Sequence, residues 1–327
     1  MTEPLNIVFM GSDPVALPLL DWLEGEGRSV ARLVGILTGP DKASGRGQSV
    51  RPNSIKAWSA GRGFPVLQPE RLDGPVLSAL SALHPDVSLV AAYGHILRDA
   101  FIGAPRLGTL NLHASLLPSY RGASPIQSAV ASGETVTGMA LMRIVRELDA
   151  GPVADVERVP IAPLDTAGDV EAKLAAAALP LLGRSLPVLA RGELKFVEQP
   201  RGATYCRRLE KADGALDFSA PAPTLAARVN GLYPWPSVTV EISGTPVRLG
   251  LAEAIDGTGP AGKVLGADAQ GLVVGTGGGL LRLRRMQRPG GKLLEAPEFL
   301  RGFPIPKGTV LPSRAMPELV APLPFRR

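Results

Sequence analysis

Histidine and cysteine are scarce in this 327-residue chain, which has three histidines and a single cysteine, Cys206. One cysteine cannot form a disulfide within the chain, and this fits a reducing cytoplasm. The histidines are scattered and no HxxEH-like or CxxC cluster exists, so we expect no bound metal. No apolar run approaches the roughly 20 residues that span a bilayer, and the N-terminus lacks the basic region of a signal peptide. We therefore expect a cytoplasmic protein with no membrane partner.

The chain also lacks nucleotide-binding fingerprints, although it opens as a β-α-β unit. An apolar run over Leu5–Met10 predicts a buried strand, Asp13 and Pro14 predict a helix start, and residues 32–37 predict a second strand. The turn after the first strand begins GSDPVA and does not follow GxGxxG, and no GxxxxGK[ST] occurs. We expect a mostly parallel α/β sheet that binds neither a dinucleotide nor a nucleoside triphosphate.

The length of the chain predicts two domains. We place the α/β domain at residues 1–190, a basic and weakly periodic linker at 191–211, and a second domain at 212–327. An alanine-rich helix near the end of the first domain should be kinked or interrupted at Pro180. The second domain has five short apolar runs separated by Gly-rich turns, a pattern typical of a small antiparallel barrel of OB type.

Positive charge is concentrated near the C-terminus. Residues 282–327 contain ten Lys/Arg and three Asp/Glu, whereas the whole chain has a net charge of +5. A basic segment indicates a polyanionic partner such as nucleic acid, but a solvated basic surface has the same composition. Residues 38–53 form a second basic stretch, which is rich in Gly, Pro and Ser and includes Arg46. A loop this long is either functional or a mobile surface loop.

Residues 108–125 are the stretch around which the rest is organised. They predict a strand, then a loop broken by Pro118, then a helix with Ser124 as its N-cap and Pro125 at its first position. Alternation within the strand places Asn111 and His113 on one face near its carboxyl end. In open α/β sheets ligands bind at that edge.

The polar residues of this region suggest acid–base chemistry. His113 can move a proton near neutral pH, and the Asn111 amide can donate to a developing oxyanion. Asp149, from a later loop, can orient the imidazole and stabilise its charged form. Ser115 has no GxSxG around it, so we expect group transfer without a covalent enzyme intermediate. A histidine at a strand end is also often purely structural, and spacing alone leaves both interpretations open.

The chain resembles the 10-formyltetrahydrofolate-dependent formyltransferases over nearly its whole length, to about residue 314. The most specific matches are NLHASLLPSYRGASPI (residues 111–126), TG (137–138) and LDAG (148–151). The others are PDKASGRG (40–47), AAYGHIL (91–97), YPWP (233–236) and MQRPGGK (286–292). The tail over residues 315–327 lies beyond the matched region.

The resemblance implies a fold, a site and a substrate pair. The fold is a Rossmann-like domain followed by an OB-like, tRNA-binding domain. Asn111, His113 and Asp149 occupy the catalytic positions. The folate-contacting positions fall on Ser115, Leu116, Leu117 and Pro118, residues 93–97 match a segment that lines the pterin pocket, and Arg46 matches an arginine that approaches the acceptor stem of a tRNA. The reaction implied is transfer of the formyl group of 10-formyltetrahydrofolate to the amine of initiator methionyl-tRNA, by a monomer.

Two alternatives stay open at this point. A sugar-nucleotide or other small-amine formyltransferase would use the same chemistry on another acceptor, and the basic loop argues against it. A non-catalytic RNA-binding protein would keep the scaffold alone, and the intact Asn111, His113 and Asp149 argue against it. Gln48 and Ser49 stand where lysines are common in the family, so the loop has fewer cations for phosphate contacts.

Overall fold

The computed structural model describes residues 3–44 and 49–325. The contacts divide the chain into two compact units. The first comprises Met1–Pro118, Gly138–Val159 and Ala172–Arg201, and the second comprises Ser119–Thr137, Pro160–Glu171 and Gly202–Arg327. Each unit thus consists of three separate segments of the chain. The sequence predicts continuous domains at 1–190 and 212–327, and these bounds remain a prediction.

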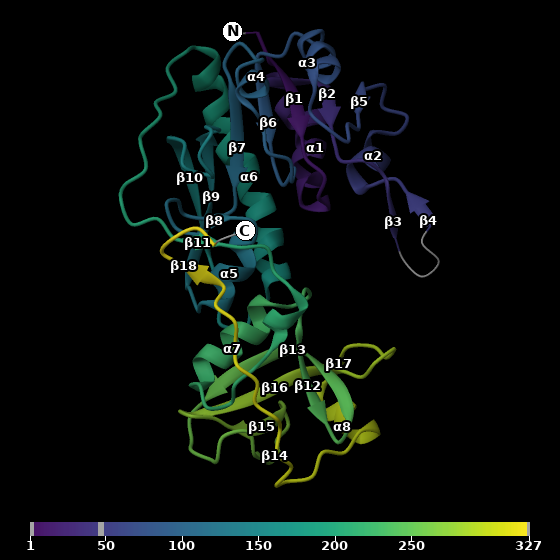
Figure 1. The fold of residues 1–327 in the computed structure, drawn as a ribbon, viewed down its shortest axis with the longest axis vertical. Helices are drawn as coiled ribbons and strands as arrows, with labels where there is room; N and C mark the ends of the chain where they lie inside the picture. The colour runs from purple at the N-terminus through teal and green to yellow at the C-terminus, as the bar shows by residue number, and fades with distance from the viewer. Residues whose placement is uncertain (1–2, 45–48, 326–327) are drawn as a thin grey trace. The chain divides into compact units, whose positions relative to one another are not determined.

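The first unit is built on a seven-stranded, mostly parallel sheet with the order β10-β9-β7-β6-β1-β2-β5 (Figure 1). Neighbouring strands from β5 to β7 are parallel, and β9 runs antiparallel to β7. The strands are β1 (Leu5–Met10), β2 (Ala31–Leu37), β5 (Val66–Leu67), β6 (Val87–Val90), β7 (Thr109–His113), β9 (Val136–Arg143) and β10 (Val153–Pro160). The sheet confirms the predicted fold class, although β10 was not predicted.

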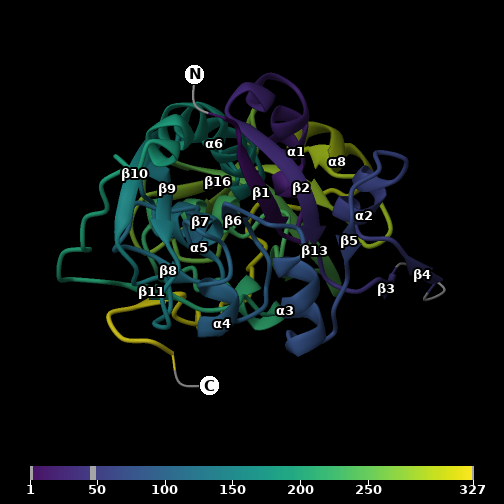
Figure 2. The ribbon, with the colours of Figure 1, turned by 90° about the horizontal axis from the view of Figure 1, so that it is seen from above.

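Helices cover both faces of this sheet. Viewed from above, α1 and α6 lie on one face, and α3 and α4 lie on the other (Figure 2). The second face is closed by apolar side chains of α3 and α4 packed against β1, β2 and β6. The helical elements are η1 (Pro14–Ala16), α1 (Leu17–Glu24), η2 (Glu26–Ser29), α2 (Ser54–Ser59), α3 (Gly74–Ser81), α4 (Asp99–Ile102) and α6 (Ala167–Ala190). As predicted, Asp13 caps the first of these by accepting a hydrogen bond from the backbone N–H of Val15.

The sequence predicts a kink or an interruption of the long helix at Pro180, and the interruption is wrong. Helix α6 continues for 24 residues with Pro180 and Pro187 inside it. A proline in a helix interior removes one backbone hydrogen bond. Leu181 and Leu182, which follow Pro180, are completely buried, so tertiary packing favours the uninterrupted helix.

Helix α6 is also, by length and composition, apolar enough to cross a membrane. Its most apolar stretch of 18 residues has a mean hydropathy of 1.3, and half of that stretch is buried inside the protein. A core helix of a soluble protein meets the same criterion, so this is weak evidence for a membrane. The expectation of a chain without a membrane partner stays a prediction.

The second unit contains an antiparallel sheet of six strands, with the order β12-β13-β16-β15-β14 and with β17 paired to β16 (Figure 1). Its strands are β12 (Val238–Ile242), β13 (Thr245–Ile255), β14 (Val264–Ala267), β15 (Leu272–Gly275), β16 (Leu280–Gln287) and β17 (Leu294–Glu295). The helical elements of the unit are α5 (Pro125–Ala131), η3 (Lys211–Gly214), α7 (Ala222–Gly231) and α8 (Ala296–Gly302). Five of the six strands fall where the sequence predicted short strands.

Two small sheets complete the structure. In the second unit, β8 (Arg121–Gly122), β11 (Tyr205–Cys206) and β18 (Val320–Ala321) form a three-stranded sheet. In the first unit, β3 (Lys42–Ser44) pairs with β4 (Ser49–Arg51). The segment expected to be a linker therefore contributes a strand, β11, to a sheet.

Replacing Gly231 by alanine should destabilise the second unit. A Cβ at this position would lie 2.3 Å from the backbone nitrogen of Ala131, where α7 meets α5. Overpacking against backbone costs about 1–3 kcal/mol, and we expect thermal unfolding to show a lower Tm. The control is Gly74→Ala, because a Cβ there meets nothing within 4 Å. Equal Tm values for the two variants would contradict this account of the α5–α7 contact.

Candidate active site

The strand β7 carries the first two candidate residues to the carboxyl edge of the parallel sheet. Its register places Asn111 opposite Val90 of the parallel strand β6, and His113 opposite Ala140 of the antiparallel strand β9. Asn111 is half-buried, whereas His113 is only 5% exposed. The strand therefore holds the imidazole in a largely water-excluded position at the edge where α/β sheets bind ligands.

Asp149 reaches this histidine from the loop that follows β9. Its Oδ2 lies 3.8 Å from Nδ1 of His113, and the two side chains are 18% and 6% exposed. This separation is longer than a hydrogen bond but short enough for an ion pair. A carboxylate at this distance stabilises the positive charge that the ring gains when it takes up a proton. The pair can therefore support general acid–base chemistry.

The loop that carries Asp149 is tightly constrained. Asp149 itself has φ +47°, a left-handed conformation that few residues other than glycine adopt. A Cβ on Gly151 would lie 2.0 Å from the carbonyl oxygen of Arg143, so only glycine fits there. The backbone N–H of Arg143 donates to the Pro152 carbonyl at 3.0 Å. The end of β9 and the Asp149 loop are thus in direct backbone contact.

The predicted folate-contacting residues follow β7 directly. Ser115 is completely buried, and Leu116, Leu117 and Pro118 are half-buried. The Leu117–Pro118 peptide bond is cis. Leu116 packs so closely on β9 that a Cβ on Gly138 would lie 2.4 Å from its Cδ2. The structure thus brings Asn111, His113 and Asp149 to one region, with these four residues adjoining it in the chain.

Two further predictions concern Arg46 and Ser124. Arg46, the predicted tRNA contact, lies outside the described residues. Ser124 stands at the N-cap position of α5 and Pro125 begins the helix, as predicted, but the Ser124 side chain makes no capping hydrogen bond. With φ −137° and ψ +53°, Ser124 lacks the extended backbone of an N-cap residue.

A polar cluster that the sequence did not reveal holds the base of the basic loop. The side-chain amide of Asn53 donates to the Gly39 carbonyl at 2.7 Å, and Gln68 donates to Asp41 at 2.7 Å. Lys56 also forms an ion pair with Asp41. Hydrogen bonds from Gln68 and Lys56 lower the pKa of Asp41, so it stays ionised. Both ends of the loop are therefore fixed.

Tyr93, in the segment expected to line a pterin pocket, is a buried hydroxyl donor. It is 4% exposed, and its Oη has no hydrogen-bond partner among the described residues. Burial raises the pKa of Tyr93 to about 12, so the phenol stays protonated at neutral pH. Its ring centroid lies 4.9 Å from that of His95. Tyr93 can donate a hydrogen bond but is unsuited to be a base.

Within residues 3–44 and 49–325, no group of three or more His, Cys, Asp or Glu side chains is arranged to hold a metal ion.

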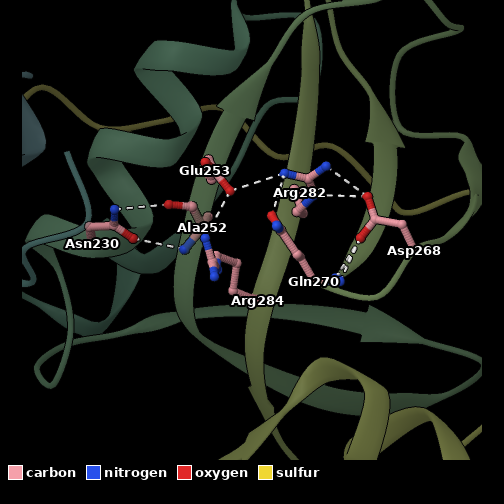
Figure 3. A network of polar contacts seen from close by, with 8 residues as sticks. Asn230, Ala252, Glu253, Asp268, Gln270, Arg282 and Arg284 are labelled. Carbon is pink, nitrogen blue, oxygen red and sulfur yellow. Dashed lines mark hydrogen bonds and ion pairs between the residues drawn. The ribbon is translucent and has the colours of Figure 1, made fainter.

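Among the described residues, three arginines of the basic segment form ion pairs within the second unit. Arg282 contacts Glu253 at 3.1 Å and Asp268 at 2.7 Å, and Arg284 shares Glu253 at 3.0 Å (Figure 3). Arg285 pairs with Glu295 at 2.7 Å. These strand arginines stabilise the sheet, so the sequence count overstates the charge available to a partner.

Two other arginines of this unit hydrogen-bond only neutral acceptors within the described chain: Arg248 donates to Ser237, Gln287 and the Pro234 carbonyl, and Arg288 donates to the Gly302 carbonyl. Arg248 and Arg288 have no carboxylate within 4.0 Å in the part of the chain that the structure describes. Arg248 lies 5.1 Å from the ring of Tyr233, and the neighbouring Trp235 is 54% exposed. A pocket of about 300 Å³ adjoins them, lined by Thr239, Pro246, Arg248, Gln287, Arg288, Pro289 and Gly290. Guanidinium groups beside exposed aromatic rings are suited to phosphates and bases.

These features define an α/β protein with a candidate acid–base site at the carboxyl edge of its parallel sheet, followed by a β-rich unit with a basic pocket. A family model described as "Formyl transferase" matches residues 5–186, and one described as "Formyl transferase, C-terminal domain" matches residues 208–304. The chain belongs to the formyl transferase family, and it is a formyltransferase of the kind that uses formyl-tetrahydrofolate.

Individual relatives agree with this assignment. The chain is 40% identical to the methionyl-tRNA formyltransferase of Aromatoleum aromaticum over 307 residues, which cover 93% of this chain and 96% of the relative. The structure resembles methionyl-tRNA formyltransferase from Clostridium thermocellum, with a TM-score of 0.56 and 13% identity over 79% and 96% of the two chains. It also resembles HypX from Aquifex aeolicus in complex with tetrahydrofolic acid, with a TM-score of 0.61 and 16% identity over 95% and 51%. The last two likenesses concern the fold alone.

Proposed function

We propose that this formyltransferase transfers the formyl group of 10-formyltetrahydrofolate to the methionine amine of initiator methionyl-tRNA. The observation that carries the catalytic part is the Asp149 carboxylate 3.8 Å from the buried imidazole of His113. The acceptor is supported by the relatives that match almost the whole chain, whose name is methionyl-tRNA formyltransferase. The product is N-formylmethionyl-tRNA, which serves translation initiation.

The chemistry assigned to the site is acyl transfer through a tetrahedral oxyanion. The amine nitrogen forms a bond to the formyl carbon, and the electron pair of the carbonyl moves to oxygen. Asn111 donates its side-chain N–H to that oxyanion. His113 accepts the proton that the amine loses and returns it to the folate nitrogen as the carbon–nitrogen bond to folate breaks. Asp149 stabilises the imidazolium between these two steps.

Substrate binding is shared between the two units in this proposal. Ser115, Leu116, Leu117 and Pro118 contact the folate beside the catalytic histidine. Arg46, in the basic loop, approaches the acceptor stem. The pocket beside Arg248 and Arg288 adds phosphate contacts from the second unit, because these guanidinium groups lack internal carboxylate partners. We further propose that the protein acts as a cytoplasmic monomer without a membrane partner.

The assigned reaction is tested with a labelled formyl donor and a panel of acceptors: charged initiator tRNA, charged elongator tRNA and a sugar amine. We expect transfer to charged initiator tRNA. Preferred transfer to the sugar amine would overturn the acceptor, and tRNA binding without any turnover would leave a non-catalytic RNA binder.

The role of His113 is tested by His113→Ala in the same assay. Removing the proton carrier should lower kcat by about 100-fold or more, since general acid–base catalysis contributes factors of this size. The control is His84→Ala, because His84 is exposed and lies outside the helices and strands, three residues after the end of α3. Full activity of the His113 variant would remove the proposed role.

The pocket of the second unit is tested by Arg248→Ala. Losing one phosphate contact should raise KM for charged tRNA several-fold, while kcat stays near the wild-type value. The slope of the logarithm of the binding constant against the logarithm of the salt concentration should become shallower by about one unit. The matched control is Arg285→Ala, because the charge of Arg285 is already shared with Glu295. The assignment fails if both substitutions raise KM equally, or if neither does.

A further inference from the structure

A short segment far along the chain lies against the loop that carries Asp149. We name residues 196–199 the strap. The backbone of Val197 exchanges two hydrogen bonds with Val153, each 2.9 Å long, and this forms an isolated antiparallel bridge. The guanidinium of Arg143 lies 4.1 Å from the ring centroid of Phe196. The strap is therefore attached to residues on both sides of the Asp149 loop, at the end of β9 and at the start of β10.

The last residue of the strap bonds the Asp149 turn itself. The side-chain nitrogen of Gln199 donates to the backbone carbonyl of Asp149 at 2.8 Å and to that of Gly151 at 2.7 Å. Carbonyl oxygens only accept hydrogen bonds, so the two N–H groups of one amide fit this pair of acceptors. The two bonds span the backbone that sets the direction of the Asp149 side chain.

This backbone needs support because of its conformation. Asp149 has φ +47°, and a residue with a Cβ holds such a conformation only when its surroundings fix it. The strap and the backbone crossing at Gly151 both act on this turn. Loss of the two Gln199 bonds allows Asp149 to relax toward common backbone angles, which turns its carboxylate away from His113.

We propose that Gln199 is a positioning residue for the formyl transfer reaction, which fixes the left-handed turn of Asp149 so that the carboxylate faces His113. The inference rests on the proposed function, since it assigns Gln199 a role through Asp149. Gln199 acts on the backbone and does not touch the reacting atoms. Its removal should therefore affect the chemical step more than the binding of either substrate.

The first test replaces Gln199 by methionine, which has a similar length and no donor. Because a misplacement of about 1 Å can cost about 100-fold, we expect kcat to fall by about 10- to 100-fold with little change in KM for either substrate. Gln199→Lys restores a donor at similar reach and should recover most of the lost kcat. The control is Glu198→Gln, an exposed neighbour in the strap. Circular dichroism and Tm identify any variant that fails to fold.

The second test is a double-mutant cycle with Asp149→Asn. If Gln199 acts through the carboxylate, Gln199→Met lowers kcat much less in the Asp149→Asn background than in the wild type. Additive losses, wild-type kcat for Gln199→Met, or equal losses for Gln199→Met and Gln199→Lys would overturn the inference. The inference also fails if Asp149→Asn alone keeps full activity, because Gln199 is assigned a role only through this carboxylate. The proposed function fails separately, if the wild-type protein transfers no formyl group.

Discussion

The contact between the Asp149 carboxylate and the His113 imidazole depends on a backbone crossing that admits only glycine. Strand β9 passes Ala140 opposite His113 and ends with Arg143 opposite Leu110, so the chain moves away from the histidine. The loop after β9 must turn back to bring Asp149 within 3.8 Å of the ring. It does so by crossing the Arg143 carbonyl at Gly151, where a Cβ would lie 2.0 Å from the oxygen. The position of the Asp149 carboxylate beside the imidazole thus depends on the close backbone contact between Gly151 and Arg143.

The second unit shows why net charge alone is a poor guide to a binding surface. Arg282 and Arg284 lie in the most basic part of the sequence, but both are held by Glu253, and this ion-pair network joins neighbouring strands of the sheet (Figure 3). Arg248 lies outside the basic C-terminal segment and has no carboxylate partner among the described residues. A phosphate gains most from a cation that no internal carboxylate already neutralises. Arginines without an internal carboxylate partner are therefore better candidates for phosphate contacts than the total charge of the segment indicates.

Local patterns in the sequence predict the elements that position the candidate site, but not every element of the sheet. Alternation predicts β7 with Asn111 and His113 on one face, and Pro125 correctly marks the start of α5. Strand β10 was missed because most of its residues, over Val153–Pro160, are only half-buried, so no apolar alternation appears. At Pro180 the local propensity predicts a kink or a break, whereas α6 is continuous through this residue because its packing favours the helix. Errors thus arise where tertiary contacts override local preference.

Some residues of the candidate site can be predicted from the sequence, and others are found only in the structure. The roles proposed for Asn111, His113 and Asp149 are roles of their side chains, so their chemistry is visible as residue types within motifs. Gln199 acts on the backbone carbonyls of Asp149 and Gly151, and every residue of a chain carries such a carbonyl. No pattern of residue types therefore marks Gln199 as their partner, and only the three-dimensional path of the strap brings it there. The group that performs a reaction can be predicted from sequence more readily than the group that holds it in position.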